Sequence, residues 1–246
     1  MKAMILAAGL GTRLGNLTSD RPKALVEVDG VPMLERVILN LKNKGFNKIF
    51  VNVHHFAPLV KKFLSEKDFG VDIIISDESE ELLDTGGGIV KASPLLFREN
   101  REPVLFHNVD ILSNADLASL THKGSAFGSS GELLVSDRNS TRKLVFNENM
   151  NLIGWHDISN DIFRPQGFLP LNDSKEYAFS GIYVLGYEAV NEMGKIMDNG
   201  KYSVMDYFVN PERECQINGF LQENLKLLDI GKPATLLQAS KFIEDI

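Results

Sequence analysis

The sequence predicts an α/β fold in which a mostly parallel sheet is followed by a smaller antiparallel portion. In the first half of the chain, short apolar runs typical of buried strands alternate with segments whose apolar residues recur at helical spacing. In the second half, short strand-like runs are separated by turn-rich segments such as residues 137–140. The first pattern is typical of parallel sheets, and the second indicates antiparallel strands.

The individual elements follow from these patterns. Leu34, Val37, Ile38 and Leu41 show the helical spacing. In the first half we expect strands at residues 2–8, 48–53, 71–75 and 104–107, and helices at 32–44, 59–64, 87–96 and 115–121. In the second half we expect strands at 133–135, 142–146, 152–155 and 177–185, then helical pieces and a last helix at 234–243. Residues 157–174 are polar and contain proline, which favours an irregular loop over a pocket.

Length and composition predict one globular domain spanning residues 1–246. The hydrophobic content of 43% and the charged content of 24% are ordinary for a soluble globular protein. A net charge of −7 argues against a nucleic-acid partner, for which a basic stripe is expected. Cations gather locally instead, at Arg13, Arg21 and Lys23. This distribution favours a small anionic substrate that is taken up with a divalent cation.

The single cysteine, Cys215, excludes an intramolecular disulfide and is consistent with a reducing compartment. No apolar run is long enough for a signal peptide or a membrane span. We therefore expect a cytoplasmic protein without membrane contact. The sequence leaves the oligomeric state open between a monomer and a small homo-oligomer.

Residues 6–25 form the most informative segment, because a glycine-bearing loop with two spaced cations directly follows an apolar strand. Gly9 and Gly11 allow a sharp turn whose backbone N–H groups can bind anions. Arg13 can contact phosphate oxygens with two donors, and Lys23, oriented by Pro22, can place a charge on another phosphate. The segment predicts a cradle for a triphosphate.

Two other phosphate-binding motifs fit this chain poorly. A Walker A loop needs Gly-Lys-Ser or Gly-Lys-Thr, and the Gly-Lys pairs at 194, 200 and 231 are followed by Ile, Tyr and Pro. A dinucleotide fingerprint needs a third glycine where Leu14 stands, and Pro22 falls where the binding helix should continue. An oxidoreductase of the Rossmann type is therefore disfavoured.

The loop resembles the signature L-A-A-G-x-G-T-R-L-x-P-L-T-x-x-x-P-K of the sugar-1-phosphate nucleotidylyltransferases, with Asn16 in place of a proline. The resemblance implies a Rossmann-like nucleotide-diphosphosugar-transferase fold with helices on both sides of the sheet and a small antiparallel sugar-binding portion. It also implies catalytic roles for Arg13 and Lys23. The nucleotide-binding residues that it implies in this loop are Ala8, Gly9, Gly11 and Thr12. We expect no C-terminal β-helix of the kind that some relatives carry.

A second glycine-rich segment, Asp84-Thr-Gly-Gly-Gly88, lies between an expected strand and an expected helix. Three glycines without side chains expose backbone donors and acceptors, against which a flat base can lie, although a flexible helix entry is the alternative. The segment resembles the L-E-T-G-G-G motif of the short uridylyltransferases that act on N-acetylmuramate 1-phosphate. That resemblance implies that Thr85, Gly86 and Gly87 bind the nucleotide.

Two aspartates are the candidate metal ligands. Asp110 follows an apolar strand, at the sheet edge where ligands bind in open α/β sheets. Asp229 lies in a run that resembles the family's D-I/V-G-T-P, with Lys232 in place of Thr, although an acid before a helix is the alternative. Two carboxylates together with substrate phosphates suit Mg²⁺. His107 and the pair at 54–55 show no zinc-ligand spacing.

The sugar site is expected near residues 179–183, which resemble the family's F-S/T-G-I-Y strand. Gly181 would let a hexose approach the backbone. Trp155 is a candidate for stacking on the sugar, with an ordinary core position as the alternative. The expected sugar-binding residues are Asn108, Trp155, Ser180 and Gly181. The E-K-P sugar motif of longer relatives is absent.

These features together predict a nucleotidylyltransferase that converts a nucleoside triphosphate and a sugar 1-phosphate into a nucleoside-diphosphate sugar and pyrophosphate. UTP is the expected nucleotide, and N-acetylmuramate 1-phosphate is the expected sugar. The alternatives are a guanylyltransferase for mannose or heptose 1-phosphate and a cytidylyltransferase for a phospho-alcohol. A catalytically silent nucleotide-sugar sensor is the non-enzyme alternative, although Arg13, Lys23, Asp110 and Asp229 are all present.

Overall fold

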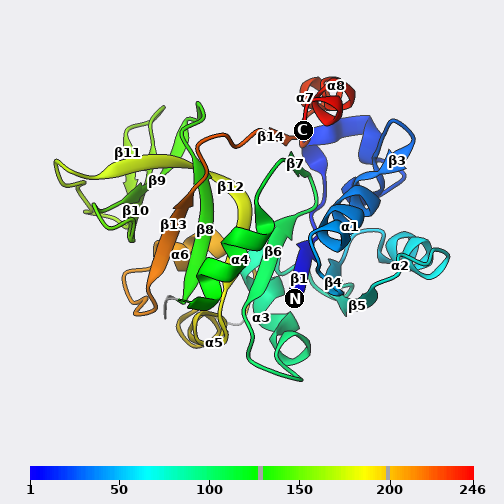
Figure 1. Ribbon diagram of the computed structural model, residues 1–246, viewed down its shortest axis with the longest axis horizontal. Coiled ribbons are helices and arrows are strands. Elements are labelled where there is room, and N and C mark those ends of the chain that lie inside the picture. The colour runs from blue at the N-terminus through cyan, green and yellow to red at the C-terminus, as the bar shows by residue number, and fades with distance from the viewer. Residues whose placement is uncertain (127–129, 198–199) are drawn as a thin grey trace.

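The computed structural model describes residues 1–126, 130–197 and 200–246 and contains a ten-stranded sheet with helices on both faces (Figure 1). Its parallel half consists of β1 (Lys2–Leu6), β4 (Lys48–Val53), β5 (Asp72–Asp77) and β6 (Val104–Asn108). The remaining strands are β8 (Gly131–Ser136), β9 (Arg142–Phe146), β10 (Leu152–Asp157), β11 (Ile162–Arg164), β12 (Lys175–Leu185) and β13 (Ile217–Leu221). The predicted α/β fold with a mostly parallel central sheet is confirmed.

The long strand β12 joins the two parts of the sheet. Its C-terminal half pairs with β6 on one side and with β8 on the other, both antiparallel, while residues 175–177 pair with β9. The order β5-β4-β1-β6-β12 therefore continues either into β8 and β13 or into β9, β10 and β11. The second branch forms the left-hand lobe of Figure 1.

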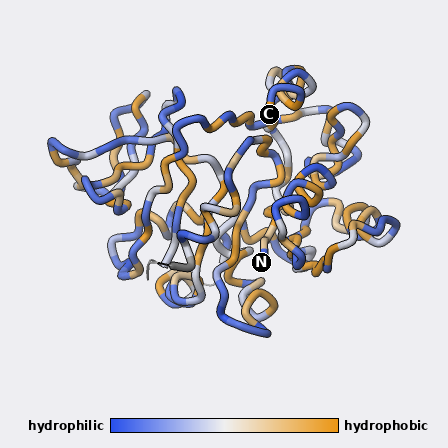
Figure 2. The backbone as a smooth tube through the Cα atoms, in the orientation of Figure 1, coloured by the Kyte–Doolittle hydropathy of each residue, from blue (hydrophilic) through white to orange (hydrophobic). Residues whose placement is uncertain are grey.

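Helices cover both faces of the sheet because each presents an apolar stripe to it. On one face, α1 (Met33–Asn43), α2 (Ala57–Ser65) and α4 (Leu117–Ala126) supply buried residues such as Leu34, Val60 and Leu120. On the other, α3 (Asp84–Leu96), α5 (Tyr187–Ile196) and α6 (Val204–Phe208) supply residues such as Ile89 and Met193. Figure 2 shows the apolar residues along the central strands and the polar ones in the outer loops.

Several short elements were not expected from the sequence. These are the 3-10 helices η1 (Thr12–Thr18) and η2 (Lys23–Leu25), the strand β13, and two small strand pairs, β2 (Glu27–Val28) with β3 (Val31–Pro32) and β7 (Ile111–Ser113) with β14 (Leu227–Asp229). The expected loop at 157–174 contains β11, because residues 162–164 pair with the end of β10. The expected helix at 234–243 is two helices, α7 (Pro233–Leu236) and α8 (Ala239–Glu244), and Leu237 between them is 87% exposed.

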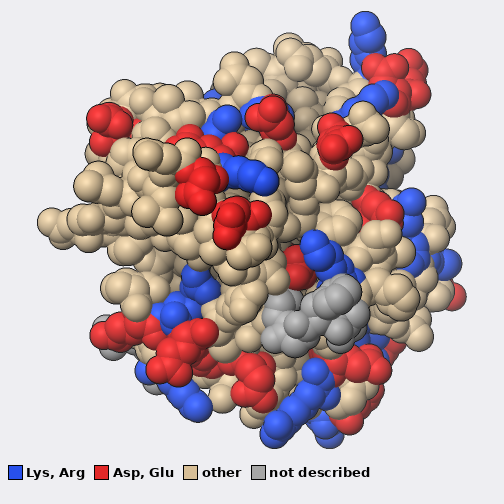
Figure 3. All heavy atoms as spheres, turned by 60° about the vertical axis from the view of Figure 1, so that its left-hand side comes forward, with Lys and Arg blue, Asp and Glu red and all other residues tan. Residues whose placement is uncertain are grey.

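The surface carries charges of both signs. On the face shown in Figure 3, acidic and basic side chains are interspersed. Among the described residues, no helix has the length and apolar character that crossing a membrane requires.

Candidate active site

A cavity of about 340 Å³ opens at the carboxyl ends of β1 and β6. These strands are parallel neighbours, with Leu6 opposite Asn108, so the segments that follow them leave the sheet side by side. The cavity is lined by the loop after β1 up to Arg13, by Lys23, by residues 108–110 at the end of β6, and by Asp84, Thr85, Lys201 and Gly231. The topology thus brings the glycine loop and the first predicted metal ligand together.

The glycine loop is fixed by close packing at Gly11. This residue has a φ of +70°, and a Cβ there would lie 3.1 Å from both Lys23 Cβ and Thr18 Cγ2. The Thr18 hydroxyl donates a hydrogen bond to the Gly11 carbonyl at 3.1 Å. A Cβ added to Gly9, in contrast, would have no heavy atom within 4 Å. The backbone at Gly9 is therefore open to a ligand, while Gly11 holds the loop against the segment that carries Lys23.

A buried polar chain attaches the same loop to the sheet. The N–H of Ala7 donates to Asn52 Oδ1 at 2.7 Å, and Asn52 Nδ2 donates to Glu78 Oε1 at 2.7 Å. Glu78 is fully buried, and this burial raises the pKa of its carboxyl. Because buried polar groups are costly unless they are paired, this chain fixes the direction of the loop where it leaves β1.

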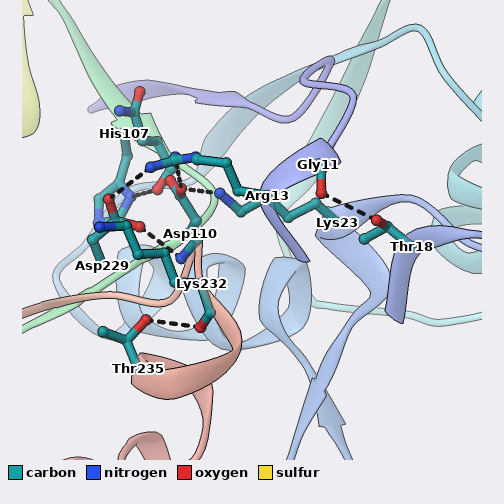
Figure 4. A network of polar contacts seen from close by, with 11 residues as sticks. Gly11, Arg13, Thr18, Lys23, His107, Asp110, Asp229, Lys232 and Thr235 are labelled. Carbon is teal, nitrogen blue, oxygen red and sulfur yellow. Dashed lines mark hydrogen bonds and ion pairs between the residues drawn. The ribbon is translucent and has the colours of Figure 1, made fainter. Parts of the chain in front are cut away.

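Two cations and two carboxylates meet at the cavity (Figure 4). Lys23 Nζ donates a hydrogen bond to Asp110 Oδ2. Arg13 lies between both acids, with Nη2 3.9 Å from Asp110 Oδ2 and Nη1 3.9 Å from Asp229 Oδ2. The Lys23 and Asp110 side chains are 11% and 13% exposed, whereas those of Arg13 and Asp229 are 58% and 47% exposed. The site thus has a buried ion pair on the inside and a more open one at its mouth.

The pairing of β7 with β14 brings Asp229 to this position. Asp229 is opposite Ile111 in the register, and the N–H of Ile230 donates to the Asp110 carbonyl at 3.0 Å. The N–H of Gly231 holds Asp229 Oδ1 at 2.7 Å. A Cβ on Gly231 would lie 2.8 Å from Arg13 Nη2, so glycine makes room there for the guanidinium.

The donor set suits a hard cation better than zinc. Within the part of the chain that the structure describes, no three His, Cys, Asp or Glu side chains form a metal-binding group. His107, in β6, is buried, and this burial lowers the pKa of its imidazole to about 4, so that it is neutral at physiological pH. Asp110 and Asp229 offer oxygen atoms beside a space for phosphates, which fits Mg²⁺ because that ion keeps few protein ligands.

The three glycines of the second motif lie at the start of α3 and are buried. The N–H of Gly86 donates to the Tyr202 carbonyl at 3.0 Å, and a Cβ on Gly87 would lie 2.4 Å from the Gly200 carbonyl oxygen. A Cβ on Gly88 would lie 2.6 Å from Glu78 Oε1. Close packing against residues 200–202 and Glu78 therefore accounts for the glycines, and neither Gly86 nor Gly87 lines the cavity. A nucleotide-binding role for these two residues stays a prediction.

The residues beside the glycines are the ones that line the cavity. Asp84, which has a φ of +60°, and Thr85 form part of its wall, and Thr85 Oγ1 accepts a hydrogen bond from the N–H of Val204 at 2.9 Å. A nucleotide-binding role for Thr85 therefore has a geometric basis, whereas Gly86 and Gly87 lie behind it.

The four expected sugar-binding residues do not all meet. Asn108 lines the main cavity, and Gly181, with a φ of +78°, leaves space for it, since a Cβ there would lie 2.7 Å from Asn108 Nδ2. Ser180 is 2% exposed, and its hydroxyl accepts a hydrogen bond from the Ile182 N–H. Trp155 lines a second cavity of about 440 Å³ together with Arg164 and Phe179. The assignment of these four residues to the sugar stays a prediction.

Sequence reasoning missed two further cations. Lys201 lines the main cavity, and Arg138 follows β8 at the same edge of the sheet as Asp110. Neither residue belongs to a motif in the sequence. The only available signal for Arg138 was its place directly after a strand.

An open α/β sheet whose carboxyl edge carries a glycine loop, paired cations and two aspartates is the architecture of a protein that binds nucleotide phosphates. The profile of the family described as "Nucleotidyl transferase" matches residues 2–143. The N-acetylmuramate alpha-1-phosphate uridylyltransferase of Caulobacter vibrioides is 31% identical over 240 residues, which are 96% of this chain and 94% of that protein. The chain therefore belongs to the nucleotidyl transferase family and is a sugar-1-phosphate nucleotidylyltransferase.

Two other proteins show how far this similarity extends. The D-glycero-alpha-D-manno-heptose 1-phosphate guanylyltransferase of Campylobacter jejuni is 34% identical over 120 residues, about half of each chain (49% and 52%). The crystal structure of HddC from Yersinia pseudotuberculosis superposes with a TM-score of 0.78 at 20% identity, covering 98% of this chain and 99% of that one. The fold is thus shared well beyond close sequence similarity.

The packing of α3 generates a stability prediction. We expect Gly87→Ala to destabilise the protein by about 1–3 kcal/mol, because the new methyl group overlaps a backbone carbonyl, which cannot move away easily. In Gly194→Ala, the control in α5, the methyl group meets only the Val90 side chain, at 3.3 Å. This variant should stay within about 1 kcal/mol of the wild type, because alanine favours a helix. Urea denaturation checks both values, and equal stability of the two variants would contradict the packing argument.

Proposed function

We propose that this enzyme transfers a uridylyl group from UTP to a sugar 1-phosphate, with N-acetylmuramate 1-phosphate as the acceptor. The observation that carries the proposal is the cluster of Arg13, Lys23, Asp110 and Asp229 beside the open backbone at Gly9. The choice of UTP and of this sugar is supported by the Caulobacter relative, which aligns along almost the whole chain. The product of this enzyme would supply nucleotide sugar for cell-wall synthesis. We propose that the enzyme is cytoplasmic and is a monomer or a small homo-oligomer.

The chemistry needs no protein base. A phosphate monoester has a second pKa near ~6, so the sugar phosphate is largely dianionic at neutral pH and can attack the α-phosphorus directly. The work of the protein is to position the reactants and to neutralise charge. Lys23, held almost out of solvent, stabilises the charge on the α-phosphoryl group. Arg13 and the N–H groups of residues 8–12 hold the departing pyrophosphate.

Asp110 and Asp229 are the residues that would hold Mg²⁺. When bound, the ion would offset the negative charge of the triphosphate oxygens. The two carboxylates come from segments far apart in the sequence and meet only through the β7–β14 pairing. Asp110 also accepts the hydrogen bond of Lys23, so that this carboxylate orients the lysine as well.

The metal assignment predicts a loss of activity in both aspartate variants. Asp110→Asn and Asp229→Asn should each lower turnover by orders of magnitude with the fold retained, because an amide binds Mg²⁺ much more weakly than a carboxylate. The control is Asp161→Asn, at a carboxylate that is 89% exposed. Pyrophosphate release with and without EDTA is the measurement. Full activity of either site variant, or of the wild type in excess EDTA, would contradict the assignment of these two aspartates as metal ligands.

The two cations should have separable kinetic effects. Lys23→Ala should mainly lower kcat, because this group acts on charge that develops in the transition state. Arg13→Ala should raise the KM for the triphosphate and also slow turnover, with each loss reaching ~2–4 kcal/mol. Arg21→Ala is the matched control, since this exposed loop arginine pairs with Asp20. Steady-state kinetics provide the test, and wild-type kinetics in Lys23→Ala would contradict its role.

Nucleotide choice separates the proposal from the guanylyltransferase alternative that the Campylobacter relative favours. A mismatched base leaves buried polar groups unpaired at roughly 1–3 kcal/mol each, so we expect UTP to exceed CTP and GTP in kcat/KM by at least about tenfold. Asp84 and Thr85, rather than the buried glycines behind them, would contact the base. The measurement is pyrophosphate release across four triphosphates with each of several sugar 1-phosphates. A higher kcat/KM with GTP or CTP would overturn the base assignment and leave nucleotidylyl transfer intact.

A further inference from the structure

Arg138 lies at the same edge of the sheet as the glycine loop and Asp110, on the far side of β12. It follows β8 by two residues, and β8 is antiparallel to β12, which is antiparallel to β6. The strands β8, β6 and β1 therefore run in the same direction and end at the same edge of the sheet. In the order β1-β6-β12-β8, the glycine loop lies at one side of Asp110 and Arg138 at the other.

The guanidinium of Arg138 is oriented by one hydrogen bond, and its other donors have no partner that the structure shows among the described residues. Nη2 donates to the Phe179 carbonyl at 2.8 Å, whereas the buried Nε has no hydrogen-bond partner among the described residues. Asp229 is near enough for the two charges to attract. Among the described residues, however, no carboxylate lies within 4.0 Å of Arg138. An arginine has five N–H donors, so most of this group's capacity remains for another partner.

This arrangement has an energetic consequence. Burial lowers the pKa of Arg138, but an arginine still keeps its charge at neutral pH. A partly buried charge without an ion pair is costly, and an anion that binds beside it recovers part of that cost. Arg142 and Arg164, the nearby arginines of the second cavity, differ in this respect because they already face Asp157 at 3.8 Å and Asp206 at 2.8 Å.

The direction of the reaction identifies the anion. In phosphoryl transfer the attacking and leaving oxygens lie roughly in line across the reacting phosphorus. With the pyrophosphate on the glycine loop, the attacking phosphate comes from the opposite side, which is the side of β12 and β8. We propose that Arg138 binds the phosphate of the sugar 1-phosphate and aims its oxygen at the α-phosphorus.

This inference rests on the proposed nucleotidylyl transfer and adds the residue that receives the second substrate. An oxygen of the sugar phosphate forms the new bond to the α-phosphorus. The bond from that phosphorus to the oxygen bridging to the β-phosphate breaks, and its electron pair leaves with pyrophosphate. Arg138 moves no proton. It supplies two parallel donors to the attacking phosphate and leaves one oxygen free to react.

The test compares Arg138→Gln and Arg138→Lys with Arg101→Gln, a control at a side chain that is 68% exposed and lines neither cavity. We expect the KM for N-acetylmuramate 1-phosphate to rise about 10- to 100-fold in Arg138→Gln, the range for a lost hydrogen bond to a charged group. The lysine variant should recover part of this loss, because it keeps the charge without the planar fork. The KM for UTP should stay within about twofold of the wild type, as should both constants in the control.

Other outcomes overturn the inference. The inference is overturned if Arg138→Gln leaves the KM for the sugar phosphate unchanged. It is also overturned if this variant raises the KM for both substrates in parallel and lowers the Tm, because the loss of a purely structural contact with Phe179 would have that effect. If the wild type releases no pyrophosphate from UTP and N-acetylmuramate 1-phosphate, the proposed substrate pair fails. The same variants are then measured with whichever triphosphate and sugar 1-phosphate the panel identifies. If no pair in the panel releases pyrophosphate, Arg138 has no such role.

Discussion

The parallel pairing of β1 with β6 is the constraint on which the site depends. It places the ends of two strands about a hundred residues apart in the sequence side by side, so that the glycine loop after one strand and Asp110 after the other line the same cavity. Asn52 on β4 and the buried Glu78 then fix the exit direction of the loop. Charges of opposite sign are therefore held together before a substrate arrives, which lowers the reorganisation that catalysis requires.

A second constraint closes the site from the C-terminal part of the chain. The strand pair β7–β14 is short, yet it brings Asp229 beside Arg13, and Gly231 lets the guanidinium lie close to the backbone. Since Asp110 immediately precedes β7 and Asp229 ends β14, any shift of register in this pair would separate the two carboxylates. The proposed metal site therefore depends on this local pairing.

Sequence reasoning was accurate for elements that are determined by neighbouring residues in the chain. It failed for features that depend on packing between distant segments. The strands β1, β4 and β6 and the helix α1 could be read from apolar runs and spacing, and the loop at residues 6–25 from its glycines and cations. The packing role of Gly86 and Gly87 could not be predicted from the sequence, because the residues that they contact, Gly200 and Tyr202, lie more than a hundred residues further along the chain. Strands of three residues such as β14 carry no periodic signal.

The bulge in β12 connects the parts of the site that would receive the second substrate. Its register with β8 shifts between Phe179 and Tyr183, where Gly181 takes a left-handed conformation and admits Asn108. The Phe179 carbonyl orients Arg138, and Phe179 also lines the cavity that contains Trp155. This one irregular strand thus orients Arg138, the arginine that we propose for the sugar phosphate, and borders the cavity that contains Trp155. A change of acceptor would therefore require changes around this bulge, whereas the nucleotide loop on the other side of Asp110 could remain as it is.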